Sequence, residues 1–156
     1  MKNNIIEGVE IKELAVHKDE RGFFCEILRN KDKILSEKFV QLNHSLSFAG
    51  VTKAWHLHKK QTDWMNVVVG DIKLVLYDTR KNSQTYKTTM EILMGETFGH
   101  KVVKIPTEVA HGYKVLNGPM HIVYVTDQEY NPADEFRIPY DDPEIGYDWK
   151  SIPAIT

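Results

Sequence analysis

Short apolar segments recur along the chain, many of them rich in Val, Ile, Tyr and Thr, and several alternate apolar with polar residues, a period-2 pattern typical of β-strands that bury one face. Such segments stand at 9–16, 22–29, 39–47, 51–58, 64–70, 72–79, 85–94, 101–106, 110–117 and 120–127. Turn-forming residues lie between several of them, at Gly70-Asp71, Asn117-Gly118-Pro119 and Asn131-Pro132. Closely spaced strands without helices between them predict an antiparallel sandwich or barrel.

One segment departs from the alternating pattern. Residues 30–39 place Ile34, Leu35 and Phe39 at helical spacing, which predicts a helix of two or three turns. A chain of 156 residues encloses one core of ordinary size. We therefore expect a single all-β domain over residues 1–156, with one short helix.

Composition and charge narrow the class of protein. Hydrophobic residues make up 42% and charged residues 27% of the chain, and the formal net charge is −2 with both signs interspersed. This balance gives no reason to expect a nucleic-acid or membrane partner. The first residues, MKNNIIEGVEIKEL, contain acidic groups and no apolar leader, and the single cysteine excludes an internal disulfide. We expect a soluble, cytoplasmic protein.

Two sets of polar residues occur at positions where β-structure alone does not require polar side chains. Arg21 lies in the turn DERGFF and offers a planar set of donors suited to phosphate, although an ordinary charged turn has the same composition. Gln41, Asn43 and Ser45 alternate along one segment and therefore face the same side of a strand. Such a stripe is either the solvated face of an edge strand or the lining of a wet cavity.

Three histidines form the third group. In GVTKAWHLHKKQTDW, residues 50–64, His56 and His58 point to one side of the predicted strand, and Trp55 and Leu57 point to the other. His111 follows at the end of a later strand, within IPTEVAHGY.

The spacing of these histidines resembles the two motifs of the cupin superfamily. Gly50, His56, His58, Asp63 and Gly70 fall at the positions of the first motif, and residues 106–111 match the second. In metal-binding cupins these positions supply three histidines and a carboxylate to one divalent ion, a ligand set suited to zinc, iron, manganese or nickel. A metal-dependent cupin using His56, His58, Asp63 and His111 is therefore one hypothesis.

A longer resemblance competes with it. Seven segments, in order along the chain, resemble the dTDP-4-dehydrorhamnose 3,5-epimerase family. They are 19–26, 41–47, 50–56, 67–86, 104–116, 124–135 and 141–149, and they include DERGFFCE, QLNHSLS, KIPTEVAHGYKVL and DDPEIGYDW. The resemblance implies a cupin-type jelly roll of antiparallel strands, a homodimer, and a reaction without cofactor or metal.

The family resemblance also implies a reaction. Its substrates are nucleoside diphosphate 4-keto-6-deoxyhexoses, used in deoxysugar and cell-surface polysaccharide biosynthesis. The C3 and C5 protons are acidic because each lies next to the C4 ketone, so a base, an acid and a donor at the enolate oxygen suffice. His56 matches the family's base. Arg21 and Lys53 match its diphosphate-binding arginines, and the resemblance places Gln41, Asn43 and His111 around the sugar nucleotide.

The chain departs from the family pattern at three catalytic positions. The lysine at the enolate oxygen is missing, and Lys60 or His58 is the available substitute. Tyr130 is the best available acid, although it corresponds to the second tyrosine of the family motif. The aspartate that pairs with the base has no counterpart. The sequence thus predicts a 3,5-epimerase-like isomerase with an incomplete catalytic set, and a non-catalytic sugar-nucleotide binder is a further alternative.

Overall fold

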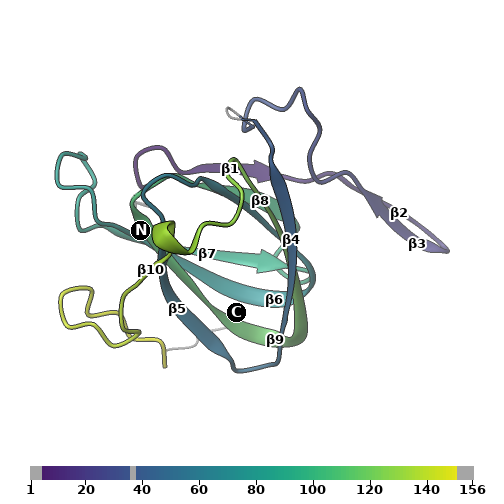
Figure 1. Ribbon diagram of the computed structural model, residues 1–156. Helices are drawn as coiled ribbons and strands as arrows, with labels where there is room; N and C mark the ends of the chain where they lie inside the picture. The colour runs from purple at the N-terminus through teal and green to yellow at the C-terminus, as the bar shows by residue number, and fades with distance from the viewer. Residues whose placement is uncertain (1–4, 36–37, 151–156) are drawn as a thin grey trace.

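The computed structural model describes residues 5–35 and 38–150, which are almost entirely strands and loops (Figure 1). The strands are β1 (Glu10–Glu13), β2 (Val16–Asp19), β3 (Gly22–Cys25), β4 (Gln41–Ser47), β5 (Thr52–Leu57), β6 (Asp63–Asp78), β7 (Thr89–Gly95), β8 (Lys101–Ile105), β9 (Val109–Thr126) and β10 (Phe136–Arg137). A 3-10 turn, η1 (Pro132–Asp134), is the one helical element among the described residues.

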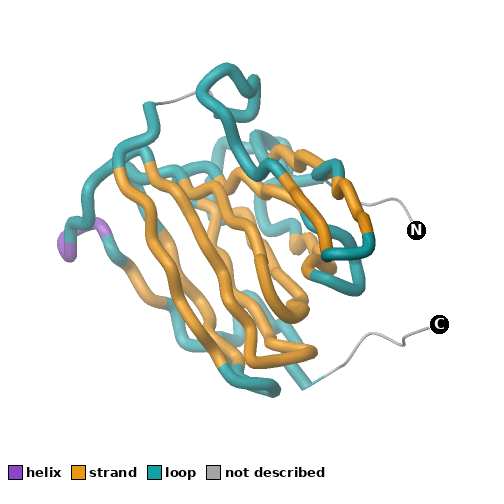
Figure 2. The backbone as a smooth tube through the Cα atoms, turned by 90° about the vertical axis from the view of Figure 1, so that its right-hand side faces the viewer, coloured by secondary structure: helices purple, strands orange, loops and turns teal. Residues whose placement is uncertain are grey.

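The two long strands β6 and β9 organise the domain. They pair antiparallel along nearly their whole length, and the order β1-β8-β6-β9-β5-β10 extends to both sides of them. β4 pairs with the second half of β9, and β7 pairs with the second half of β6. The sheet curls around an interior (Figures 1 and 2), and the arrangement is the antiparallel jelly roll expected of a cupin-type fold.

The prediction of turns at Gly70-Asp71 and at Asn117-Gly118-Pro119 is wrong, because both sites lie inside long strands. Asp71 pairs with Asn117, and the register of β6 and β9 shifts on either side of Gly70. Gly70 has φ +81°, and a Cβ there would lie 2.5 Å from the Asn117 carbonyl oxygen. The turn-forming residues therefore produce irregularities at which both strands bend, rather than chain reversals.

The prediction of a helix over residues 30–39 is also wrong for the described part of that segment, which forms turns. The Asp32 carboxylate accepts a backbone hydrogen bond from Arg29 and lies 2.6 Å from Lys12 Nζ. The carbonyl of Ile34, which a helix would use internally, accepts the indole N–H of Trp64 at 2.7 Å. Contacts with the barrel thus replace the helical hydrogen bonds that the apolar spacing predicted.

The core fills the interior between the two halves of the sheet. Its main cluster includes Ile72, Leu74, Met94 and Val115, all essentially inaccessible to solvent. Trp55, Trp64 and Trp149 are buried as well. Trp55 and Trp149 pack together under the C-terminal loop, with ring centroids 4.9 Å apart.

An ion pair between Asp78 and Arg80 lies at the end of β6, with Arg80 Nε 2.8 Å from Asp78 Oδ1. Ser83 and Thr85 also donate hydrogen bonds to the Asp78 carboxylate. Burial opposes ionisation of this group, yet these hydrogen bonds hold the pKa of Asp78 well below its usual value. The network fixes the loop that follows β6.

The hairpin of β2 and β3 leaves the barrel and extends away from it (Figure 1). Phe23 and Phe24 are 53% and 67% exposed on this hairpin, and the turn at its tip contains Arg21. In the described part of the chain, no helix is long and apolar enough to cross a membrane.

Candidate active site

A cavity of about 210 Å³ opens into the barrel between β4, β5, β6 and β9. Its lining is rich in polar and titratable side chains from these four strands, and Tyr130 and Glu135 close one side of it. A polar, concave space of this kind inside an otherwise apolar barrel is the natural candidate for a ligand site.

The polar stripe of β4 lines this cavity. Gln41, Asn43 and Ser45 alternate with exposed Leu42 and with other outward-facing residues, so the three polar side chains face inward together. Gln41 Nε2 donates to Asn43 Oδ1 at 2.7 Å. Of the two interpretations of the stripe, the lining of a cavity is confirmed and the solvated face of an edge strand is wrong.

The histidines meet across the pairing of β5 and β9. His56 lies opposite His111 in the register, and their ring centroids are 6.2 Å apart. His58 lies at 6.0 Å from His111 by the same measure. Gly112 permits this close approach of the strands, since a Cβ there would lie 2.6 Å from the Ala54 Cβ. The predicted convergence of the three imidazoles is therefore confirmed.

The environment of His56 keeps its ring neutral. Burial, reinforced by the neighbouring His111 and Arg137, lowers the pKa of His56 to about 4. No hydrogen bond or ion pair joins His56 to a carboxylate among the described residues, and the acidic group acting on it is Glu135, through its charge alone. At neutral pH His56 has an imidazole nitrogen that is free to accept a proton.

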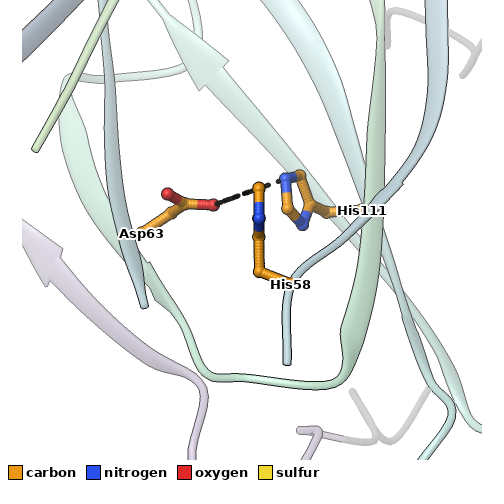
Figure 3. A group of neighbouring side chains, drawn as sticks. All are labelled: His58, Asp63 and His111. Atoms are coloured by element: carbon orange, nitrogen blue, oxygen red, sulfur yellow. Dashed lines mark ion pairs between the residues drawn. The ribbon is translucent and has the colours of Figure 1, made fainter. Parts of the chain in front are cut away.

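A second group lies beside it, formed by His58, Asp63 and His111 (Figure 3). Asp63 Oδ2 lies 3.6 Å from His111 Nε2 and 3.9 Å from His58 Nε2. Burial raises the pKa of Asp63 to about 6, against the opposing effect of His58. Burial lowers the pKa of His111 to about 4, again with a contribution from His58. The carboxylate missing beside His56 is thus present beside the other two rings.

Asp134 holds the loop between β5 and β6, a role that the sequence did not reveal. Its carboxylate accepts backbone N–H bonds from Lys59, Lys60 and Gln61, at 3.1 to 3.2 Å. Its backbone carbonyl lies 2.9 Å from His58 Nδ1. The only signal was an acidic residue after a turn-forming Asn-Pro pair, and nothing in that pattern indicates a buried carboxylate that caps a distant loop.

Tyr130 lies at the cavity mouth, on the loop between β9 and η1. Its backbone N–H donates to Gln41 Oε1 at 2.9 Å, and its hydroxyl lies 3.3 Å from Glu135 Oε2. Its side chain is 64% exposed. The tyrosine is therefore anchored through its backbone while most of the residue is exposed.

The structure brings together six of the eight predicted site residues and leaves two apart. The six that line the cavity are His56, Tyr130, Gln41, Asn43, Lys53 and His111. Lys60 is exposed on the loop after β5, and the Arg21 side chain is 81% exposed on the projecting hairpin, where it pairs with Asp19. Neither side chain lines the cavity of its own chain.

Comparison with known proteins agrees with this geometry. Residues 3–156 match the family model described as dTDP-4-dehydrorhamnose 3,5-epimerase. The spore coat polysaccharide biosynthesis protein SpsL of Bacillus subtilis strain 168 is 44% identical, over 94% of this chain and 98% of that protein. The dTDP-4-dehydrorhamnose 3,5-epimerase of Methanothermobacter thermautotrophicus is 34% identical, over 92% of this chain and 80% of that enzyme.

A solved structure extends the likeness to three dimensions. The 3,5-epimerase of Legionella pneumophila, crystallised with dTDP-4-keto-L-rhamnose, superposes with a TM-score of 0.85 at 30% identity. The match covers 99% of this chain and 85% of that one.

Proposed function

This chain belongs to the dTDP-4-dehydrorhamnose 3,5-epimerase family, and we propose that it epimerises a nucleoside diphosphate 4-keto-6-deoxyhexose. The reaction removes a proton from a carbon next to the C4 ketone, forms an enolate, and returns a proton to the opposite face. Such chemistry needs a neutral base, an acid across the ring and a donor at the enolate oxygen. The product would serve the assembly of a deoxysugar-containing polysaccharide, and a cytoplasmic location stays a prediction.

His56 is the proposed base, and its neutral, cavity-facing ring is the observation that carries the proposal. Its pKa of about 4 ensures that the ring is unprotonated before substrate arrives. A bound diphosphate would bring negative charge near the cavity and raise this pKa, because an anion stabilises the imidazolium. Substrate binding would thereby strengthen the base at the moment it is needed.

Tyr130 is the proposed acid. It lines the cavity, its hydroxyl lies 3.3 Å from Glu135 Oε2, and its backbone N–H donates to Gln41 Oε1. Of the two residues considered for the enolate oxygen, His58 lines the cavity whereas Lys60 does not. We therefore assign the oxygen to the side of the cavity that contains His58.

Lys53 is the proposed diphosphate contact within the chain, since it lines the cavity and carries a positive charge. Arg21 requires a second copy to reach a cavity, because its hairpin extends away from the barrel (Figure 1) and Arg21 does not line the cavity of its own chain. We propose a homodimer in which this hairpin packs on the partner and brings Arg21 to the partner's site. Two exposed apolar features support it, namely Phe23 and Phe24 on the hairpin and a groove beside Leu42 on the outer face of the sheet.

The direct test is turnover. Purified protein would be incubated with a dTDP-linked 4-keto-6-deoxyhexose, and the products followed by NMR for inversion at C3 and C5. Inversion at either carbon supports the proposal. Tight binding of dTDP without inversion of any 4-keto sugar would contradict it and favour a non-catalytic binder. Such a binder is the alternative because no carboxylate among the described residues is hydrogen-bonded to His56.

A further inference from the structure

His58 and His111 each direct an unprotonated ring nitrogen toward Asp63. A ring nitrogen next to a backbone carbonyl must be the protonated one, because a carbonyl oxygen only accepts hydrogen bonds. His58 Nδ1 lies 2.9 Å from the Asp134 carbonyl, and His111 Nδ1 lies 3.3 Å from the Val109 carbonyl. In the neutral rings, both Nε2 atoms therefore have a lone pair and no proton, and both are directed at Asp63.

Asp63 contributes a third lone pair to this space. Its Oδ1 accepts a hydrogen bond from Gln61 Nε2 at 2.8 Å, which leaves Oδ2 to face the two imidazoles. The residue is only 3% exposed, so bulk water does not solvate the carboxylate. Three buried acceptor atoms that face one another repel unless a metal cation or a shared proton lies between them.

We propose that His58, Asp63 and His111 bind one divalent transition-metal ion. The three ligand atoms lie within 4.8 Å of one another, and the two separations to Asp63 are close to the roughly 3.4 Å that joins ligands around tetrahedral zinc. Two imidazoles and one carboxylate are a set that zinc, iron, manganese and cobalt accept. The backbone carbonyls on both Nδ1 atoms are the outer-shell partners that metal-binding histidines ordinarily have.

The site would be an open one. Three protein ligands leave at least one coordination position, and all three residues line the cavity, so that position faces the candidate active site. His56 is outside the group, which leaves it available as a base. If the proposed function holds, the ion would lie on the same side as the enolate oxygen and supply the positive charge that the family's lysine provides elsewhere.

Metal binding is measurable without any sugar nucleotide, so it succeeds or fails independently of the epimerase proposal. The protein would be stripped with EDTA, exchanged into chelator-free buffer, and titrated with Zn²⁺ by calorimetry, with Co²⁺ absorption as a second probe. We expect about one equivalent per chain. Asp63→Asn and His111→Gln should each weaken binding by about 100-fold or more, since even the loss of an outer-shell partner costs 10- to 100-fold.

The matched control is the outer pair His44 and His121, whose rings stack 5.1 Å apart on the solvent face without a carboxylate ligand. The double variant His44→Asn/His121→Asn should bind zinc as the parent does. Gln61→Ala retains all three ligands and should weaken binding by about 10-fold, which keeps the test valid if Asp63→Asn fails to fold. Binding below about a tenth of an equivalent, equal affinity in the site variants, or loss in the control would overturn the proposal and leave a shared proton in this space.

Discussion

The cavity wall and the β2–β3 hairpin both carry residues that we propose to act on the substrate, but they hold them differently. In the wall, His56 and His111 lie opposite each other on paired strands, and Gln41 bonds to both Asn43 and Tyr130. On the hairpin, Arg21 is exposed and pairs with Asp19, two residues away. The wall is therefore a prearranged site, whereas the hairpin brings no residue to the cavity of its own chain.

The difference has a simple origin in strand geometry. A strand of the barrel sends every second side chain into the interior, so a polar stripe on it faces other strands at close range. A two-stranded hairpin away from the barrel has no facing strand, and most of the residues of β2 and β3 are exposed. The proposed base and acid of the wall should accordingly affect the chemical step, and residues of the hairpin should affect binding and assembly.

The largest effect is expected from the base. His56→Asn should lower kcat by about 10³-fold, because loss of a general base typically costs 10²- to 10⁴-fold. The KM for the sugar nucleotide should change little. Steady-state kinetics checks this, with His44→Asn on the outer face as the control. A variant with more than a tenth of the parent's kcat would show that the base lies elsewhere.

Tyr130→Phe comes next. Removing the hydroxyl should lower kcat by about 10²-fold, because a proton from solvent replaces the positioned acid less efficiently. The backbone bond from residue 130 to Gln41 is retained in this variant, so the loop should stay in place. Product analysis by NMR gives a further readout, namely whether both carbons lose inversion or only one. An unchanged kcat would remove Tyr130 from the mechanism.

The hairpin should affect affinity. Arg21→Ala should raise KM by about 10-fold with little change in kcat, the cost expected for one charge-assisted hydrogen bond to phosphate. A mixture of Arg21→Ala and His56→Asn chains tests the dimer, since refolding them together should restore one intact site per mixed dimer. Activity that stays at the sum of the two separate variants would place Arg21 in its own cavity or outside the site.

The smallest expected difference is between the KM values of two lysine variants, at Lys53 and at Lys60. Lys53 lines the cavity and Lys60 does not, so Lys53→Ala should raise KM by about 10-fold while Lys60→Ala stays within about twofold of the parent. Parallel kinetics on the two variants is enough. Equal losses would mean that the loop after β5 closes over the substrate and brings Lys60 into the site.

Sequence patterns predicted the fold class and that Gln41, Asn43 and Ser45 share one face of β4, because period-2 alternation maps directly onto the two sides of a strand. They left open whether that face points inward or to solvent. The sequence-based predictions failed where a short stretch of residues is compatible with two local structures. Gly70 could reverse the chain or bend a long strand, and the pairing of Asp71 with Asn117 decided for the bend. Ile34 could begin a helix, but its carbonyl bonds to Trp64 instead.

The candidate site was predictable to the extent that its residues are close in sequence or match the family. His56 and His58 were found from their spacing, and His111 from the second motif. Asp134 was not, because its bonds to Lys59, Lys60 and Gln61 join segments more than 70 residues apart. The distinction between His56 and the group of His58, Asp63 and His111 also required distances, since spacing alone placed all four residues together.

Hydrogen exchange into the substrate tests the central claim most directly. A dTDP-linked 4-keto-6-deoxyhexose would be incubated in D₂O with the parent protein or with His56→Asn, and deuterium at C3 and C5 of the recovered sugar measured by NMR and mass spectrometry. The parent should introduce deuterium at one or both carbons, and the variant should introduce it at about a thousandth of that rate or less. Absence of deuterium at both carbons with the parent protein, or equal exchange with His56→Asn, would contradict the account.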